Sequence, residues 1–147
     1  MEKRINIDTV TPEAYKAMYA LEGFLAKAEI SKTLKELIKI RASLINNCAF
    51  CIDMHTKDAI KNGETTQRLF LIGAWHEAPN FFSEEEQIVL TMTEEITLIT
   101  NGGLSDNTYR KASQFFSEKQ IAEIIMTIVT INAWNRIAIS TKMEISK

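Results

Sequence analysis

Residues 117–139 read SEKQIAEIIMTIVTINAWNRIAI, and they set the architecture expected for the whole chain. Ser117 and Gln120 form a capping box, in which each side chain bonds to the other residue's backbone N–H at the start of a helix. From Ile121 to Ile139, apolar residues occupy nearly every side of that helix. Because a helix that is apolar all round must be covered on all sides, we expect it at the centre of a helical domain or at a subunit interface. At such an interface, Asn132, Asn135 and Arg136 would be the polar partners that fix the register of the helix.

Helical signals continue through the rest of the chain. Pro12 suits the first position of a helix, Ser83 and Glu86 form a second capping box, and Gly63 is a helix stop. The expected helices cover approximately residues 12–28, 32–45, 48–62, 65–76, 84–99, a short segment from 105, and 121–139. No segment alternates between apolar and polar residues as a strand does. The sequence therefore predicts one all-α domain over residues 1–147, with about seven helices and no repeat or linker.

Composition narrows the class of protein. The chain has 147 residues and 46% apolar content, enough for one core without disulfide staples. Seventeen Lys and Arg oppose nineteen Asp and Glu, and no basic patch is present, so we expect no nucleic-acid partner. No apolar run approaches the ~20 residues of a membrane span, and the start of the chain lacks a signal peptide. We therefore expect a cytoplasmic protein with no membrane partner.

The two cysteines of the chain, Cys48 and Cys51, lie at the start of the third expected helix. Helical neighbours three residues apart have Cβ atoms roughly 5–6 Å apart, slightly more than a disulfide spans, so a small adjustment would close the pair. Asn47 is a good N-cap, and the positive end of the helix dipole favours thiolate over thiol. His55 falls on the same face. These residues together favour a redox dithiol.

Glu36 is the candidate acid or base for this pair. It lies twelve residues before Cys48, on a stripe with Ile40, Ser43 and Asn47 that can face the cysteine helix. We expect partial burial to raise its pKa, so that it takes a thiol proton directly, through His55 or through water. Taken alone, Glu36 also fits a solvated helix charge, and His55 an ordinary surface or core histidine.

Other residues are interpreted as structural. His76 has no partner that the sequence identifies, and the run of glutamates at 84–86 complements the dipole of its helix. The large aromatic residues are expected in the core: Trp75, Trp134, Phe81, Phe82, Phe115 and Phe116.

Two other classes of function remain open at this stage. In a metal-binding module, Cys48, Cys51 and His55 would be ligands, with Glu36 or His76 as the fourth. In a non-catalytic assembly module, the thiols would be inert and the apolar helix faces would bind other subunits. The redox interpretation requires no metal and no cofactor.

The same residues resemble a known family. The segment LKELIKIRAS at 34–43, followed by NNCAFCIDMHT at 46–56, is similar to the core of the alkylhydroperoxidase D-like, carboxymuconolactone decarboxylase family. Glu36, Cys48, Cys51 and His55 have the spacing of that family's redox signature. The resemblance extends through AWHEAP at 74–79, FSEEE at 82–86 and NAWNR at 132–136.

This resemblance implies an all-helical subunit that forms trimers or hexamers and has thiol peroxidase or disulfide reductase activity. Well-known members also relay electrons from a lipoylated protein to a peroxiredoxin, but they carry a His where this chain has Phe50. The decarboxylase branch lacks the cysteine pair, so decarboxylation is disfavoured.

The resulting hypothesis is a thiol peroxidase with Glu36, Cys48, Cys51 and His55 as catalytic residues. Its partners are a hydroperoxide substrate and an external dithiol of the lipoyl or thioredoxin type. The attacking sulfur stays open, because the helix dipole favours Cys48 whereas the proximity of His55 favours Cys51.

Overall fold

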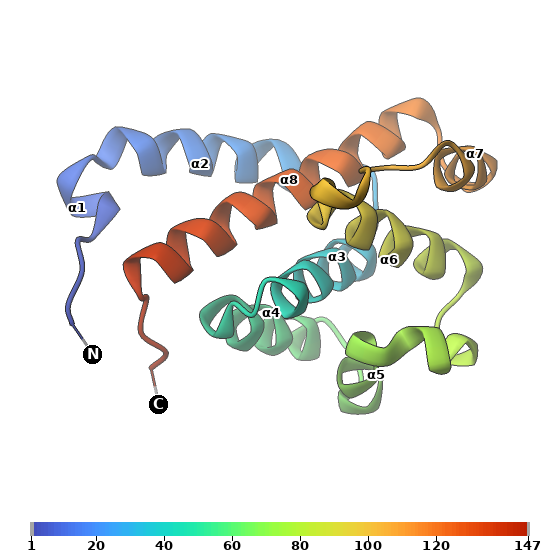
Figure 1. Ribbon diagram of the computed structural model, residues 1–147, viewed down its shortest axis with the longest axis horizontal. Helices are drawn as coiled ribbons and strands as arrows, with labels where there is room; N and C mark the ends of the chain where they lie inside the picture. The colour runs from blue at the N-terminus through green and yellow to red at the C-terminus, as the bar shows by residue number, and fades with distance from the viewer. Residues whose placement is uncertain (1, 147) are drawn as a thin grey trace.

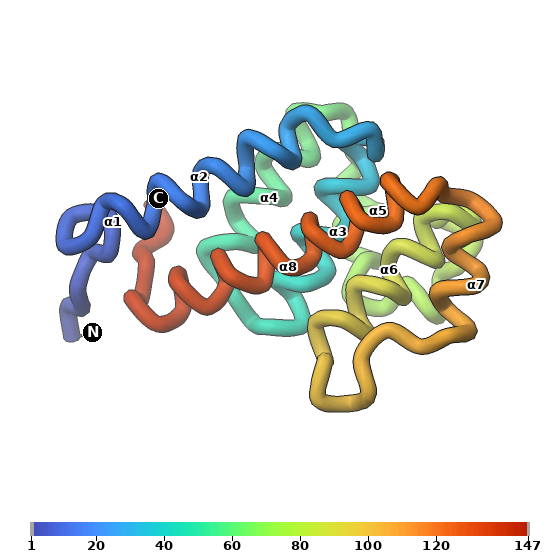
Figure 2. Tube along the Cα trace, turned by 90° about the horizontal axis from the view of Figure 1, so that it is seen from above, coloured from blue at the N-terminus to red at the C-terminus, as the bar shows by residue number. Residues whose placement is uncertain are grey.

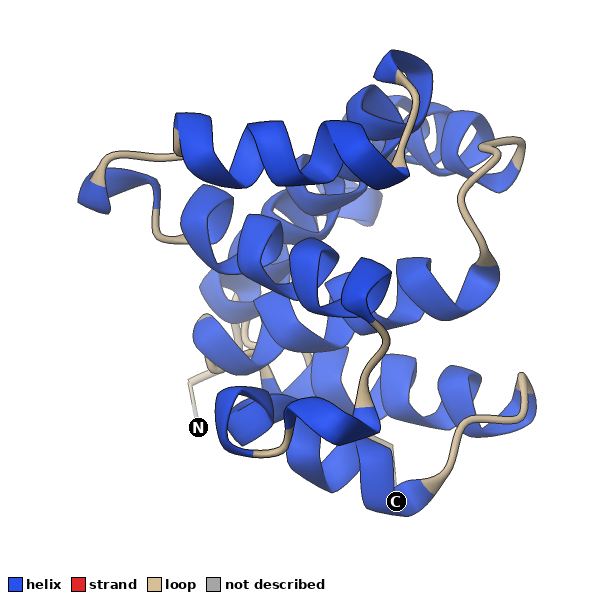
Figure 3. Cartoon of the chain, turned by 90° about the vertical axis from the view of Figure 1, so that its right-hand side faces the viewer, coloured by secondary structure: helices blue, strands red, loops and turns tan. Residues whose placement is uncertain are grey.

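The computed structural model describes residues 2–146, which fold into helices without a strand (Figure 3). The α-helices are α1 (Ile7–Val10), α2 (Pro12–Ala26), α3 (Lys32–Ile45), α4 (Ala49–Lys61), α5 (Thr66–Leu71), α6 (Glu84–Thr97), α7 (Asp106–Phe115) and α8 (Glu118–Thr141). Three short 3-10 helices join them: η1 (Ile72–Glu77), η2 (Pro79–Phe81) and η3 (Ile99–Asn101). The predicted all-α class is confirmed. None of the described helices is long and apolar enough to cross a membrane.

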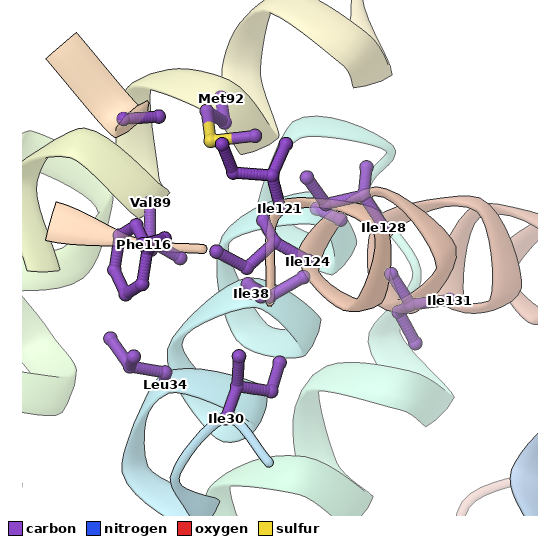
Figure 4. Packing of buried hydrophobic residues seen from close by; sticks show 12 residues of the cluster. Ile30, Leu34, Ile38, Val89, Met92, Phe116, Ile121, Ile124, Ile128 and Ile131 are labelled. Carbon is purple, nitrogen blue, oxygen red and sulfur yellow. The ribbon is translucent and has the colours of Figure 1, made fainter. Parts of the chain in front are cut away.

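Helix α3 lies at the centre of the molecule, in contact with α4, α6 and α8. Helix α2 runs beside α8, and both chain ends lie at the same end of the molecule (Figures 1 and 2). The main core forms where α3, α6 and α8 meet, and Figure 4 shows the α8 residues Ile121, Ile124, Ile128 and Ile131 packed there. This arrangement leaves the first turn of α4 beside the C-terminal half of α8.

Helix α8 is central, as its sequence indicates, but its own chain does not cover every side. Ile124 and Ile128 are fully buried, whereas Val129 and Ile139 are more than two-fifths exposed. Capping boxes begin both α6 and α8, at Ser83 with Glu86 and at Ser117 with Gln120, as predicted.

Several local expectations differ from the structure. The helix expected over 65–76 changes from α5 to a 3-10 helix, with non-helical backbone at Ala74. The helix expected to reach Ile99 ends at Thr97, and Gly102 takes a left-handed conformation with φ of 113° after η3. The short helix α1 was not predicted. Phe82 and Phe116 are buried as expected, but Phe115 is exposed because it lies on the solvent side of α7.

One buried carboxylate fastens the loop between α2 and α3 to α8. Glu123 is 3% exposed, and its Oε2 accepts hydrogen bonds from the backbone N–H groups of Glu29 at 2.8 Å and Ile30 at 3.3 Å. A carboxylate that satisfies two backbone donors makes charge-assisted hydrogen bonds, which are stronger than neutral ones.

We expect Glu123→Ala to lower the free energy of unfolding by about 3 kcal/mol, because two backbone donors lose their acceptor. Glu118→Ala is the matched control. It removes an exposed carboxylate in the first turn of the same helix, so we expect a loss below about 1 kcal/mol. Chemical denaturation measures both losses. Equal losses in the two variants would contradict this role of Glu123.

Candidate active site

The two cysteines are bonded to each other at the start of α4. Cys48 is the N-cap residue and Cys51 lies in the first turn, with their Cα atoms 5.4 Å apart. Asn47, predicted as the N-cap, instead forms a left-handed turn with φ of 54°. The backbone N–H of Cys48 donates to the carbonyl oxygen of Ser43 at 2.9 Å, which ties this turn to the end of α3. The cap is therefore one residue later than predicted, and both sulfurs remain at the positive end of α4.

A polar network fixes this turn against α8. Asn46 donates through Nδ2 to the Oδ1 atoms of Asn132 and Asn135, at 2.9 Å each. Asn135, which is fully buried, donates to Ser43 Oγ at 3.0 Å. We expected Asn132, Asn135 and Arg136 to be polar partners at a subunit interface. That expectation is wrong for the two asparagines, which bond within their own chain.

Glu36 of α3 and His55 of α4 lie close together, and His55 is one helical turn after Cys51. Glu36 Oε2 and His55 Nδ1 lie 3.5 Å apart, and neither buried atom has a hydrogen-bond partner among the described residues. This separation is slightly longer than an ordinary hydrogen bond, so a small movement would form one. Contact through Nδ1 leaves Nε2 of the imidazole on the other side of the ring. The structure therefore brings Glu36 and His55 together, as the sequence indicated.

The expected rise in the pKa of Glu36 is wrong because of the charges around it. Burial raises the pKa of the Glu36 carboxyl, but the opposing effects of His55 and of the Lys39 ammonium, 3.4 Å away, outweigh it. The resulting pKa lies below the usual value of 4.5, not above it as predicted. Glu36 is therefore an anion at neutral pH. An anion suits the stabilisation of a protonated His55 better than it suits the donation of a proton.

The lowered pKa of Glu36 makes a prediction about stability. A carboxyl whose pKa is lower in the folded chain stabilises the fold above its unfolded pKa and loses this effect as the pH falls through its folded pKa. We therefore expect wild type to unfold at a higher temperature than Glu36→Gln at pH 7, and the difference to shrink as the pH falls below 4.5. The other carboxyl groups titrate in both proteins and cancel in the comparison. A difference that stays constant from neutral to acidic pH would contradict the assigned pKa direction.

An aromatic cleft opens over Cys51. It measures about 370 Å³ and is lined by His55 and Cys51, by Phe50 and Met54 of α4, by Tyr15 and Tyr19 of α2, and by Trp134 and Ala138 of α8. The Tyr15 and Trp134 rings meet edge to face, with centroids 5.4 Å apart. Trp134 Nε1 donates to Glu22 Oε1 at 3.0 Å, which fixes the indole between α2 and α8. The lining also includes the charged residues Glu22, Lys39 and Asp58, so a substrate that enters this cleft meets a mainly apolar wall with charged groups in it.

This cleft contains the residues that the sequence did not identify. Trp134 was expected in the core, but it is only partly buried and lines the cleft. Tyr15 and Tyr19 are one turn apart on α2, a spacing that places them on one face of a helix, yet nothing in the sequence says that this face meets α8.

His76 lies outside the site. Its Nε2 is 2.8 Å from Glu94 Oε2, and the same carboxylate accepts from Trp75 Nε1 at 2.7 Å and from Arg41 Nε at 3.0 Å. Across residues 2–146, no three His, Cys, Asp or Glu side chains form a group suited to holding a metal ion. His76 therefore has a partner, Glu94, that the sequence did not identify. His76 is not positioned as a fourth metal ligand beside the cysteines.

The features of the site are typical of a class of thiol proteins: an all-helical domain that holds a bonded Cys-x-x-Cys pair, a buried histidine and a partly buried carboxylate. Residues 12–94 match the family model described as the carboxymuconolactone decarboxylase family. The chain belongs to this family, in its alkylhydroperoxidase D-like branch. A relative in Bacillus subtilis (strain 168), the uncharacterized protein YdfG, is 42% identical over 140 residues, which are 95% of each chain.

Solved structures share the fold. A protein of unknown function from Agrobacterium tumefaciens, described as a candidate antioxidant defence protein AhpD, superposes with a TM-score of 0.94 at 36% identity over 99% of both chains. An uncharacterized peroxidase-related protein from Silicibacter sp. TM1040 gives a TM-score of 0.80 at 21% identity, over 91% of this chain and 71% of its own. The debrominase Bmp8 gives 0.82 at 18% identity, over 94% of this chain and 74% of its own. The last two similarities concern the fold alone.

Proposed function

We propose that this protein is a thiol-dependent hydroperoxidase that cycles between a dithiol and the Cys48–Cys51 disulfide. The observation that carries the proposal is the bonded pair beside a mainly apolar cleft, with His55 in the lining of the same cleft and Glu36 3.5 Å from His55. The antioxidant description of the Agrobacterium protein supports the same class of activity. The cycle requires a reducing compartment, so a cytoplasmic location is part of the proposal.

Cys51 is the attacking sulfur in this scheme. It shares the aromatic cleft with His55, whereas Cys48 is absent from that lining. His55 takes the thiol proton and Glu36 stabilises the imidazolium that forms. The Cys51 thiolate attacks the distal oxygen of the hydroperoxide, the O–O bond breaks, and the proton passes to the leaving alkoxide to give an alcohol. Cys51 is left as a sulfenic acid.

Cys48 completes the oxidation half of the cycle. Its thiol condenses with the sulfenic acid of Cys51, the S–O bond breaks, and water leaves as the disulfide forms. The disulfide then takes two electrons from an external dithiol through thiol–disulfide exchange. The lipoyl and thioredoxin types remain the two classes of reductant proposed for this step.

The experiment measures peroxide consumption with several substrates and reductants. Hydrogen peroxide, an alkyl hydroperoxide and an aromatic hydroperoxide are each supplied with a lipoyl dithiol or a thioredoxin-type dithiol. Turnover with any pair supports the proposal. A brominated pyrrole serves as a competing substrate, because the debrominase Bmp8, a variant of which was solved in complex with 2,3,4-tribromopyrrole, has this fold. Debromination without peroxide turnover would replace the proposed reaction. Disulfide reduction without turnover of any peroxide would identify a disulfide reductase or electron carrier.

We propose in addition that the protein is a homo-oligomer, a trimer or a hexamer. The exposed apolar residues of α8, Val129 and Ile139, support this, since apolar surface invites association. Light scattering coupled to size exclusion at micromolar concentration is expected to give three or six times the subunit mass of 16.7 kDa. A monodisperse monomer would contradict the proposal.

A further inference from the structure

The two cysteines of the disulfide line different clefts. Cys51 lines the aromatic cleft, and Cys48 lines a second cleft of about 560 Å³ between the start of α4 and the end of α8. Phe50, Ala138 and Met143 line both clefts and so form the partition between them. A molecule in one cleft therefore lies beside only one of the two cysteines.

The chain's own C-terminal segment forms the outer wall of the second cleft. We call residues 142–146, which follow α8, the C-terminal strap. Its first two residues are held by backbone hydrogen bonds, from Lys142 N–H to Ile139 at 3.3 Å and from Met143 N–H to Ala138 at 3.0 Å. Lys142 turns the chain, with a left-handed φ of 53°.

The rest of the strap is held weakly. Among the described residues, Glu144 and Ile145 take part in no hydrogen bond, although both line the Cys48 cleft. Ile145 is 43% exposed, whereas Cys48 behind the strap is only 1% exposed. Few apolar contacts and no hydrogen bonds characterise segments that open at low cost in free energy. The strap beyond Met143 can therefore move without unfolding α8.

We propose that the Cys48 cleft is the entrance for the reductant and that the C-terminal strap gates it. This inference rests on the proposed dithiol cycle. A thiolate of the reductant attacks Cys48 Sγ, the Cys48–Cys51 bond breaks, and Cys51 leaves as a thiolate. The second thiol of the reductant then attacks the mixed disulfide, which releases the Cys48 thiolate and oxidises the reductant to its own disulfide.

Attack at Cys48 is the chemically favoured direction. Exchange is faster when the departing thiolate is better stabilised, and Cys51 departs into the cleft that it shares with His55. The oxidant and the reductant then use opposite sides of the partition. A small dithiol fits the second cleft beside the strap, whereas a dithiol on the surface of a folded protein needs the strap displaced.

The test removes the strap and compares two reductants. A chain that ends at Met143 keeps both capping hydrogen bonds and loses Glu144 onward. Its disulfide is formed with diamide, so that no peroxide is needed. We expect reduction by a thioredoxin-type protein to accelerate roughly tenfold or more, and reduction by dithiothreitol to change by less than about twofold. Ile99→Ser is the control: it removes an exposed isoleucine of η3 that lines neither cysteine cleft, and it is expected to change neither rate.

A second variant and a second measurement test the gate in case the shortened chain folds poorly. Ile145→Ser in the full-length chain is expected to shift the protein-dithiol rate in the same direction by a smaller factor. In the reduced protein, removal of the strap is expected to speed alkylation of Cys48 by a bulky maleimide, with Cys51 unchanged.

Two results would overturn the gate: unchanged reduction by the protein dithiol, or equal acceleration with both reductants, which indicates general loosening. If peroxide fails to oxidise the full-length protein, the proposed function is wrong. The gate can still be tested in that case, because diamide forms the disulfide without peroxide.

Discussion

Replacing Cys51 with Ser is expected to lower peroxide turnover by ~1,000-fold or more, because the attacking sulfur is lost. Cys48→Ser is expected to stop multiple turnover as well, but for a different reason. Cys51 still reacts once and remains a sulfenic acid, since no neighbouring thiol can condense with it. A sulfenic-acid probe is therefore expected to label Cys48→Ser after peroxide treatment and not to label Cys51→Ser.

The two variants are well matched. Both cysteines are almost completely buried, at 1% and 2% exposure, so each Ser removes a similar contact from the same cluster. Single-turnover oxidation followed by mass spectrometry reads the result directly. The assigned roles would be reversed if the probe labelled Cys48 in the Cys51→Ser variant and left the Cys48→Ser variant unlabelled.

His55→Phe is expected to slow the reaction of Cys51 with peroxide by about 100-fold, because the thiol loses the group that accepts its proton. Alkylation of the reduced protein at neutral pH is expected to slow as well, and raising the pH should restore much of the rate by ionising the thiol. The measurement is the rate of alkylation against pH, with circular dichroism to confirm the helix content.

The chain's other histidine supplies the control. His76 is bonded to Glu94 and lines neither of the clefts at the cysteines, so His76→Phe is expected to leave the pH profile of alkylation unchanged. Equal effects of the two substitutions, or no effect of either, would remove His55 from the mechanism. Such a result would leave the Glu36–His55 contact as a structural pair.

The elements of the fold were predictable where local rules dominate. The capping boxes at Ser83 and Ser117 depend only on residues three positions apart, so they can be recognised in the sequence. The same holds for the apolar pattern of α8. The contact of Glu36 with His55 was also predictable, because the two residues lie on consecutive helices and each is on the face of its helix that turns toward the other. The cap at Cys48 was missed by one residue, because Asn47 is equally suited to a left-handed turn and takes that role here.

The rest of the site depends on contacts between distant parts of the chain. The cleft joins Tyr15 and Tyr19 to Trp134, and the pairing of α2 with α8 has no local signal. The direction of the Glu36 pKa was wrong because Lys39 and His55 outweigh burial, a balance that only the folded geometry fixes. Asn132 and Asn135 were assigned to a subunit interface because the partners Ser43 and Asn46 lie on another helix.

The most direct test of the central claim is intact-mass spectrometry of the reduced protein after one equivalent of hydroperoxide. The account predicts the loss of two hydrogen atoms per chain, with the bond mapped to the peptide that contains Cys48 and Cys51, and full recovery with dithiothreitol. Disulfide-linked dimers between chains, irreversible sulfonic acid, or an unchanged mass would contradict a reversible dithiol cycle at this site.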